Sequence, residues 1–204
     1  NTSNRPFRMS YRLGLTGSIG MGKSTTAQLF AIEGIPVWDA DAEVHALYGP
    51  DGKATRRIAG LFPDVIVDGA VSRALLREKI TADPAVLDVI QQQVHPLVAA
   101  SRTAFLEKTS DPIVLLDVPL LFETGADALC DGIVVVSVPA DVQRQRVLSR
   151  GMSPAEFELI LARQLADAEK RRRATWVIET TTLDSATQAV KQILMEIRQG
   201  LANA

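Results

Sequence analysis

One glycine-rich stretch constrains this chain more than any other feature. Residues 17–24 read Gly-Ser-Ile-Gly-Met-Gly-Lys-Ser and match the pattern G-x-x-x-x-G-K-[ST]. An apolar run at residues 11–16 precedes the stretch, a helical pattern at residues 23–33 follows it, and Gly34 supplies a helix stop. Such glycines let successive backbone N–H groups turn inward at the positive end of a helix dipole. The motif therefore predicts a phosphate-binding loop, or P-loop.

The residue types in the loop indicate a nucleoside triphosphate and a metal ion. Lys23 is expected to reach the β- and γ-phosphates of ATP, the Ser24 hydroxyl to bind Mg²⁺, and Thr25 to hydrogen-bond the α-phosphate. The other expected ATP contacts are Gly17, Ser18, Ile19, Gly20, Met21 and Gly22. The alternative is a turn that merely joins a strand to a helix, but the pattern arises by chance in only about one such chain in a hundred.

Further apolar runs predict the rest of a sheet. They lie at residues 35–38, 113–117, 132–138 and 176–178. Continuous runs of this kind suit a parallel sheet that is covered on both faces, and strands that alternate with helices indicate a doubly wound α/β fold. We therefore expect residues 11–204 to form one P-loop NTPase-like unit with a five-stranded parallel sheet, ending in an amphipathic helix at residues 185–198.

Two mostly helical excursions interrupt the alternation. Residues 40–110 are expected to form a substrate-binding insertion, in which Asp83 and Pro84 begin a helix. Residues 141–173 are expected to form a lid, and Ser153-Pro154-Ala155-Glu156 within it is a capping box. From residue 143 to 173 there are eight basic and four acidic residues, although the whole chain has a net charge of -2. Positive charge is therefore concentrated in the expected lid.

The arginines of the expected lid are candidates for closing over the transferring phosphoryl group. They are Arg144, Arg146, Arg150 and Arg163. For each one the alternative is a place on a solvated helix face. The run at residues 170–173 is expected to be solvated surface or charge at a helix C-terminus.

Three aspartates follow predicted strands. Asp117 ends its apolar run as a Walker B aspartate does, and it is the expected second anchor for Mg²⁺, either directly or through water. Asp39 and Asp41 follow the second strand, at the edge of the sheet where α/β proteins bind ligands. Asp39 is the preferred base for a hydroxyl proton. Turn formation or turn capping is the alternative role for all three. His45 and His95 are isolated and support no metal or hydrolase site.

Composition limits the remaining possibilities. The pI near 5.7 argues against a surface built to attract nucleic acid. Cys130 is the only cysteine, which excludes an intrachain disulfide and fits a reducing cytoplasm. No apolar run reaches about 18 residues and no signal peptide is evident, so no membrane partner is expected. Met9 is a plausible natural start, so residues 1–10 are expected to be an added remnant or a disordered start.

The order of several short elements narrows the function. They are Gly14 to Gly20, Asp39-Ala40-Asp41, His95-Pro96, Asp117 to Glu123 and the stretch 146–164. Together they closely resemble the dephospho-coenzyme A kinase family. The resemblance implies transfer of the ATP γ-phosphate to the ribose 3′-hydroxyl of dephospho-coenzyme A, which gives coenzyme A and ADP as the last step of that pathway. It implies ATP and dephospho-coenzyme A as small-molecule partners, and we expect a monomer or a weak homo-oligomer.

The resemblance also implies residue roles. Asp39 would be the base, with Lys23 and Arg146 as further catalytic residues and Arg146 and Arg150 as lid residues that bind ATP. The substrate contacts would be Asp39, Asp41, His95, Leu120, Leu121, Phe122 and Glu123. Ser18 stands where a glycine is usual in the family, and Met21 where a small residue is usual. Glu179-Thr180 replaces the usual Asp-Asn or Asp-Thr, and a missing glycine after it leaves the adenine contact unassigned.

Three other functions share some of these features. A nucleoside monophosphate kinase has the same loop, insertion and lid. A GTPase switch is a different class, but the chain has no Asn-Lys-x-Asp element to recognise guanine. A nucleotide-binding regulator would bind ATP and phosphorylate nothing. Products formed from a panel of acceptors separate the three.

Overall fold

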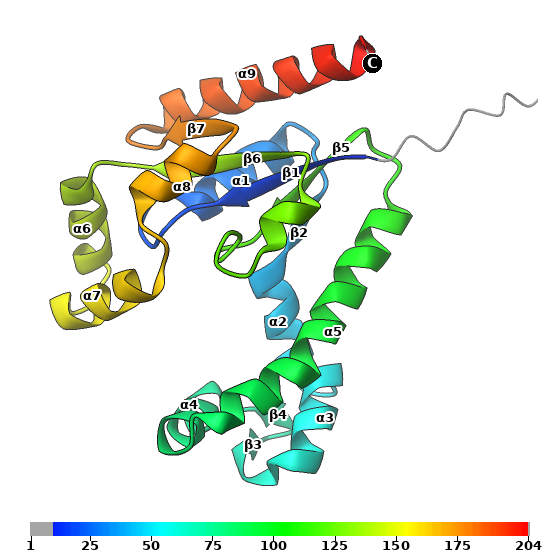
Figure 1. Ribbon diagram of the computed structural model, residues 1–204, viewed down its shortest axis with the longest axis vertical. Coiled ribbons are helices and arrows are strands. Elements are labelled where there is room, and N and C mark those ends of the chain that lie inside the picture. Colours follow the sequence, from blue (N-terminus) through cyan, green and yellow to red (C-terminus); the bar gives the residue numbers. More distant parts are fainter. Residues whose placement is uncertain (1–9, 204) are drawn as a thin grey trace, which may run out of the picture. The chain divides into compact units, whose positions relative to one another are not determined.

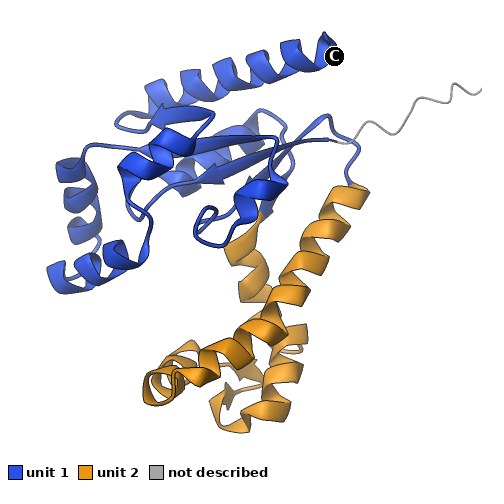
Figure 2. Ribbon diagram, in the orientation of Figure 1, with its two compact units in different colours: residues 1–38, 109–204 blue, residues 39–108 orange. Residues whose placement is uncertain are grey.

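The computed structural model describes residues 10–203. The chain forms two compact units, which Figure 2 shows in different colours. The first unit contains the residues up to Trp38 together with those from Thr109 onward, and the second contains residues 39–108. The expectation about the start of the chain concerns residues 1–10. Residues 1–9 lie outside the described residues, and Ser10 is the first residue described.

A five-stranded sheet forms the centre of the first unit. Its strand order is β2-β5-β1-β6-β7. The strands are β1 (Tyr11–Thr16), β2 (Val37–Asp39), β5 (Ile113–Asp117), β6 (Gly132–Ser137) and β7 (Trp176–Glu179). β1 pairs in parallel with β5 and with β6, and β6 pairs in parallel with β7. The predicted doubly wound sheet is thus confirmed, and the pairing of Leu15 with Asp117 places the end of β5 beside the start of the P-loop.

Helices cover both faces of this sheet. Figure 1 shows α8 (Asp167–Arg173) in front of the sheet and α1 (Lys23–Ile32) behind it. α9 (Leu183–Ala202) packs against α1 and β7. Its buried side chains recur with the helical period at Ala186, Val190, Ile193, Leu194 and Ile197. These side chains share one core with residues of β1, β5, β6 and β7. The core holds the strand ends, and therefore the P-loop, in place.

Local signals set several helix ends as predicted. Gly34, at φ 82°, follows α1 in the left-handed conformation that favours glycine. α6 (Ala140–Ser149) and α7 (Pro154–Arg163) occupy the expected lid, and a short 3₁₀ helix lies at Ala126–Leu129. Pro154 is the first residue of α7, and the Ser153 hydroxyl accepts a hydrogen bond from the Glu156 N–H at 3.2 Å. The predicted N-cap is confirmed.

The second unit is mostly helical and has its own core. Its elements are α2 (Ala40–Tyr48), α3 (Lys53–Leu61), η1 (Pro63–Val65), β3 (Ile66–Val67), β4 (Ala70–Val71), α4 (Arg73–Ala82) and α5 (Ala85–Lys108). Leu47, Ile58 and Ile90 are among its buried residues. The hairpin β3–β4 was not expected. It turns at Asp68 and Gly69, both with positive φ, which is the geometry that an Asp-Gly pair favours.

Candidate functional site

The P-loop joins β1 to α1 in a conformation that requires glycine. Gly20 has φ 76° and Gly22 has φ 84°. A Cβ atom on Gly20 would lie 2.6 Å from Val147 Cγ2, and one on Gly22 would lie 2.9 Å from the Thr180 hydroxyl oxygen. These two positions therefore need glycine both for backbone conformation and for space. The loop is packed tightly against α6 on one side and against the segment after β7 on another.

The first turn of α1 is available to an anion. Gly22 is its N-cap residue and provides no side-chain hydrogen bond to the helix N-terminus. Ser24 and Thr25 in this turn are exposed. Unsatisfied N–H groups at a helix N-terminus carry partial positive charge, so this end of α1 can bind phosphate oxygens.

Lys23 and Asp117 form an ion pair beside the loop. The Lys23 ammonium donates a short hydrogen bond to Asp117 Oδ1. The Lys23 side chain is 16% exposed and that of Asp117 is 4% exposed. Asp117 is the last residue of β5, so the register between β1 and β5 brings this carboxylate to the lysine. The structure thus brings together the two residues that the sequence predicted to work on phosphate and metal.

The donors at this site fit Mg²⁺ bound together with a nucleotide. Ser24 and Asp117 offer oxygen atoms, which Mg²⁺ prefers, and the ion usually takes its other ligands from phosphates and water. Within residues 10–203 no group of three or more His, Cys, Asp or Glu side chains forms a metal cage. The buried Ser18 hydroxyl has no hydrogen-bond partner among residues 10–203. The loop therefore retains a donor for a polar ligand.

The segment after β7 contacts both the loop and the lid. The Thr180 hydroxyl donates to the Met21 carbonyl oxygen at 2.5 Å, and Arg146 Nη2 donates to the Thr180 carbonyl oxygen at 2.7 Å. Arg146 of α6 is thereby tied to the P-loop through one residue. No sequence pattern predicts a role for Thr180, because its contact with Met21 joins residues that are 159 positions apart.

The other arginines of the expected lid differ in their surroundings. Arg144 pairs with Glu158 at 2.8 Å and lies over the Phe157 ring, so it connects α6 to α7. Arg150 and Arg163 are exposed. Arg144 is therefore engaged within the lid, whereas Arg150 and Arg163 face solvent.

A second lysine–carboxylate pair lies in the first unit. Glu123 Oε1 accepts a hydrogen bond from the Leu165 N–H at 2.8 Å and lies 3.0 Å from Lys170 Nζ. Lys170 is fully buried and is therefore not solvated surface, whereas the other expected placement of the run, at a helix C-terminus, is confirmed, because residues 170–173 form the last turn of α8. Burial alone would raise the pKa of Glu123, but the hydrogen bond from Leu165 and the charge of Lys170 outweigh burial and lower it. Arg171, Arg172 and Arg173 are exposed.

The neighbours of Glu123 are mainly core residues. Leu121 and Phe122 are buried, and the Arg173 guanidinium lies 5.7 Å from the centroid of the Phe122 ring. Leu120 is exposed. Glu123 is also exposed as a residue, although its side chain is only 17% exposed.

Asp39, Asp41 and His95 belong to the second unit, whereas the P-loop, Asp117 and the lid arginines belong to the first. Asp39 ends β2 and is the N-cap of α2, where its Oδ1 accepts from the N–H groups of Asp41 at 2.9 Å and Ala42 at 3.0 Å. These bonds fix the direction of the carboxylate. Asp41 and His95 are exposed, and His95 precedes Pro96 inside α5.

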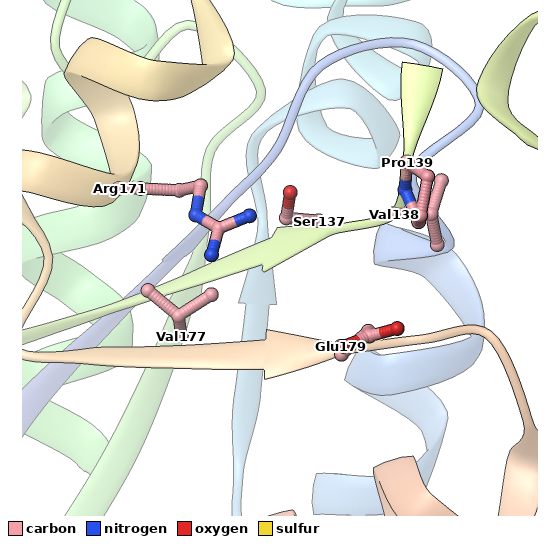
Figure 3. Close-up of a pocket in the computed structure, with 6 residues that line it drawn as sticks. All are labelled: Ser137, Val138, Pro139, Arg171, Val177 and Glu179. Carbon is pink, nitrogen blue, oxygen red and sulfur yellow. The ribbon is translucent and has the colours of Figure 1, made fainter. Parts of the chain in front are cut away.

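A pocket of about 290 Å³ lies near the ends of β6 and β7. Figure 3 shows the residues that line it, which are Ser137, Val138, Pro139, Arg171, Val177 and Glu179. None of the site residues predicted from the sequence lines this pocket. Val138 nevertheless connects the pocket to the P-loop, because its N–H donates to Met21 Sδ at 3.1 Å.

The nest of backbone donors, with its lysine and its oxygen ligands for a metal, sits at the carboxyl end of a parallel sheet in the strand order 2-5-1-6-7. This combination defines a P-loop kinase.

Comparisons with known proteins identify the kind of kinase. The family model described as dephospho-CoA kinase matches residues 11–185. A dephospho-CoA kinase of Cereibacter sphaeroides is 54% identical over 96% of this chain and 98% of its own length, and one of Ruegeria pomeroyi is 49% identical over 96% and 100%. The chain belongs to the dephospho-CoA kinase family.

Solved structures share the fold of this chain. The protein TT1252 from Thermus thermophilus has a TM-score of 0.82 and 34% identity, with 92% of this chain and 97% of that chain covered. A dephospho-CoA kinase from Campylobacter jejuni has a TM-score of 0.65 at 18% identity, with 93% and 98% covered, and supports the fold alone.

Proposed function

We propose that this chain transfers the γ-phosphoryl group of ATP to the ribose 3′-hydroxyl of dephospho-CoA, which gives CoA and ADP and completes CoA biosynthesis. The observation that carries the proposal is the match to the dephospho-CoA kinase family over residues 11–185, which includes an intact P-loop. The chain is thus an ATP-dependent phosphotransferase.

The P-loop residues bind and orient the nucleotide in this proposal. Backbone N–H groups of the loop and of the first turn of α1 hold the phosphates, and Thr25 contacts the α-phosphate. Lys23 exchanges its Asp117 partner for phosphate oxygens. Ser24 and Asp117 would then hold Mg²⁺. When bound, the ion neutralises charge on the β- and γ-phosphates.

Asp39 is the proposed base that accepts the proton of the attacking hydroxyl. Its carboxylate direction is set by the two backbone N–H groups at the start of α2. A proton acceptor in the right orientation contributes about 10² to 10⁴ in rate. Asp41, His95 and the loop from Leu120 to Glu123 are the proposed contacts of the acceptor, and residues 40–110 are the proposed substrate-binding insertion.

Residues 141–173 are the proposed lid. Arg146 and Arg150 would stabilise negative charge on the transferring group, because a guanidinium binds phosphate oxygens in a fixed fork. Closure over both substrates would exclude water, which is the competing nucleophile. Hydrolysis of ATP is therefore expected to be slow when no acceptor is present.

We also propose that the chain acts in the cytoplasm as a monomer or a weak homo-oligomer. The single cysteine fits a reducing compartment. Among residues 10–203, no helix has the length and apolar character needed to cross a membrane.

Product analysis tests the proposed function. The protein is incubated with Mg-ATP and dephospho-CoA, and the acceptor is weighed by mass spectrometry. We expect the acceptor to gain one phosphoryl group. Nucleoside monophosphates and GTP serve as competing acceptor and donor. Phosphorylation of a monophosphate instead, or release of ADP with no modified acceptor, would reject the proposal.

A further inference from the structure

Both ends of the arginine-bearing lid segment are bonded to one P-loop residue, Ile19. From α6, Gln143 Nε2 donates to the Ile19 carbonyl oxygen at 2.8 Å. The Ile19 N–H donates to Oε1 of Gln164, the C-cap residue of α7, at 3.2 Å. The chain between the two glutamines carries the four candidate arginines of the lid. A single loop residue therefore anchors the start and the end of this segment.

The side of α6 that faces the loop is closely packed. Gln143 is only 5% exposed and Val147 is buried beside it. A Cβ atom on Gly20 would meet Val147 Cγ2 at 2.6 Å and the Gln143 carbonyl oxygen at 3.2 Å. A hydrogen bond in such surroundings is shielded from water and is stronger than one at the surface. The Gln143 bond therefore contributes to fixing the loop conformation.

The backbone next to Gln164 is held by a carboxylate that belongs to an ion pair. The next residue, Leu165, donates its N–H to Glu123 Oε1 at 2.8 Å, and this carboxylate pairs with the fully buried Lys170. The backbone at residues 164 and 165 is thus held by a side chain outside the P-loop. With the backbone held, the Gln164 amide stays directed at Ile19.

We propose that Gln143 and Gln164 are positioning residues for phosphoryl transfer. Their two bonds to Ile19 orient the loop backbone and hold both ends of the lid segment to it, so that phosphate binding and lid placement are coupled. The proposal rests on the proposed function and adds residues to it. Neither glutamine is expected to touch the reacting atoms. Both act through Ile19 and through the arginines between them.

Gln→Met and Gln→Glu substitutions test the two bonds, because the bonds run in opposite directions. Gln164 accepts, so Gln164→Glu keeps the acceptor and Gln164→Met removes it. Gln143 donates, so both Gln143→Glu and Gln143→Met remove the donor. One such bond corresponds to about a tenfold effect. We expect Gln164→Met, Gln143→Met and Gln143→Glu to lose about tenfold in kcat, and Gln164→Glu to stay within about threefold of the wild type.

The ratio of phosphoryl transfer to ATP hydrolysis distinguishes a positioning role of the two glutamines from a purely structural one. If the lid is loosened, water competes better, so we expect this ratio to fall about tenfold in the three impaired variants. Gln192→Met is the matched control, because Gln192 is exposed on α9 and donates to Glu196 of the same helix. An unchanged ratio in Gln164→Met, or equal loss in Gln164→Glu and Gln164→Met, would overturn the proposal.

A second measurement keeps this inference separate from the proposed function. Trypsin cleaves after arginine, and the segment from 144 to 163 contains four. We expect Mg-ATP to protect this segment in the wild type and in Gln192→Met, and to protect it several-fold less in Gln164→Met. This readout needs no acceptor, so it remains valid even if dephospho-CoA is not phosphorylated. Equal protection in all three proteins would contradict the coupling.

Discussion

Two lysine–carboxylate pairs in the first unit have the same chemistry and different surroundings. Lys23 pairs with Asp117 beside the P-loop, and its side chain is 16% exposed. Lys170 pairs with Glu123 and is completely buried. In the proposed function Lys23 gains an alternative partner in the phosphates of a nucleotide, whereas Lys170 is enclosed by protein. An ion pair alone therefore does not mark a functional residue, and access to a second partner is what separates the two lysines.

Removal of the two lysines is therefore expected to affect different properties of the protein. Breaking a buried pair leaves an uncompensated charge and typically costs about 3 to 5 kcal/mol of stability. A lysine that exchanges a carboxylate for phosphate instead contributes to binding and to the transition state. We therefore expect changes at Lys23 to act on catalysis and changes at Lys170 to act on folding.

The largest effect is expected for Lys23→Met. A cation on the transferring phosphoryl group is worth roughly 10⁴ in rate, so kcat/KM for ATP should fall by about that factor. Steady-state kinetics with dephospho-CoA as acceptor provide the measurement. A fall of less than tenfold would mean that Lys23 resembles Lys170 in being structural.

Asp39→Asn should lower kcat by about 10³, because asparagine cannot accept the hydroxyl proton. The asparagine Oδ1 can still accept from the N–H groups of Asp41 and Ala42, so the start of α2 should persist. The affinity for ATP, measured by calorimetry, should stay within about twofold. Wild-type turnover in this variant would eliminate Asp39 as the base.

Lys170→Met should lower the free energy of unfolding by about 3 kcal/mol, because Glu123 loses its cation in a largely buried site. The affinity for ATP should change less than threefold, since Glu123, the partner of Lys170, is not one of the proposed ATP contacts. Urea unfolding and calorimetry check the two quantities. A loss of ATP affinity at unchanged stability would reverse the assignment of the two lysines.

The same pair predicts a pH dependence. The folded protein lowers the pKa of Glu123 below its ordinary value of 4.5. The unfolded chain therefore binds this proton more readily, so the stabilisation is complete above about pH 4.5 and is lost as the pH falls through the lowered pKa. Thermal unfolding of the wild type and of Glu123→Gln should differ most at neutral pH and converge under acid. A gap that widens on acidification would contradict the assignment.

The smallest effect is expected for Thr180→Val. The substitution removes the hydroxyl that donates to the Met21 carbonyl oxygen and keeps the size of the side chain. Losing one such buried bond costs about 1.4 kcal/mol, so the affinity for ATP should fall about tenfold. Calorimetric titration gives the value. Wild-type affinity would show that the segment after β7 does not help to shape the P-loop.

Local patterns predicted the features that depend on neighbouring residues. The P-loop, the strand that ends in Asp117 and the N-cap Ser153 each have a signature within a few positions. The Asp68-Gly69 turn also had one, and it was missed. The placement of the strands in one sheet could also be predicted, because apolar runs of this length and spacing favour a parallel sheet.

Long-range partners could not be predicted in the same way. Ile19 and Gln164 are 145 positions apart, and Leu165 and Glu123 are 42 apart. Lys170 lies in a strongly basic run that is typical of a solvated helix end, and only the packing of α8 on β6 buries it. Such contacts depend on how the elements pack, which no local spacing encodes.

The central claim is that the loop from Gly17 to Thr25 binds the phosphates of ATP. Phosphorus NMR of Mg-ATP during titration with the protein tests it most directly, because each phosphate has its own resonance. The account predicts saturable shifts of the β- and γ-phosphate resonances at submillimolar protein, and their loss in Lys23→Met. Unshifted resonances at millimolar concentrations, or equal shifts in the variant, would contradict it.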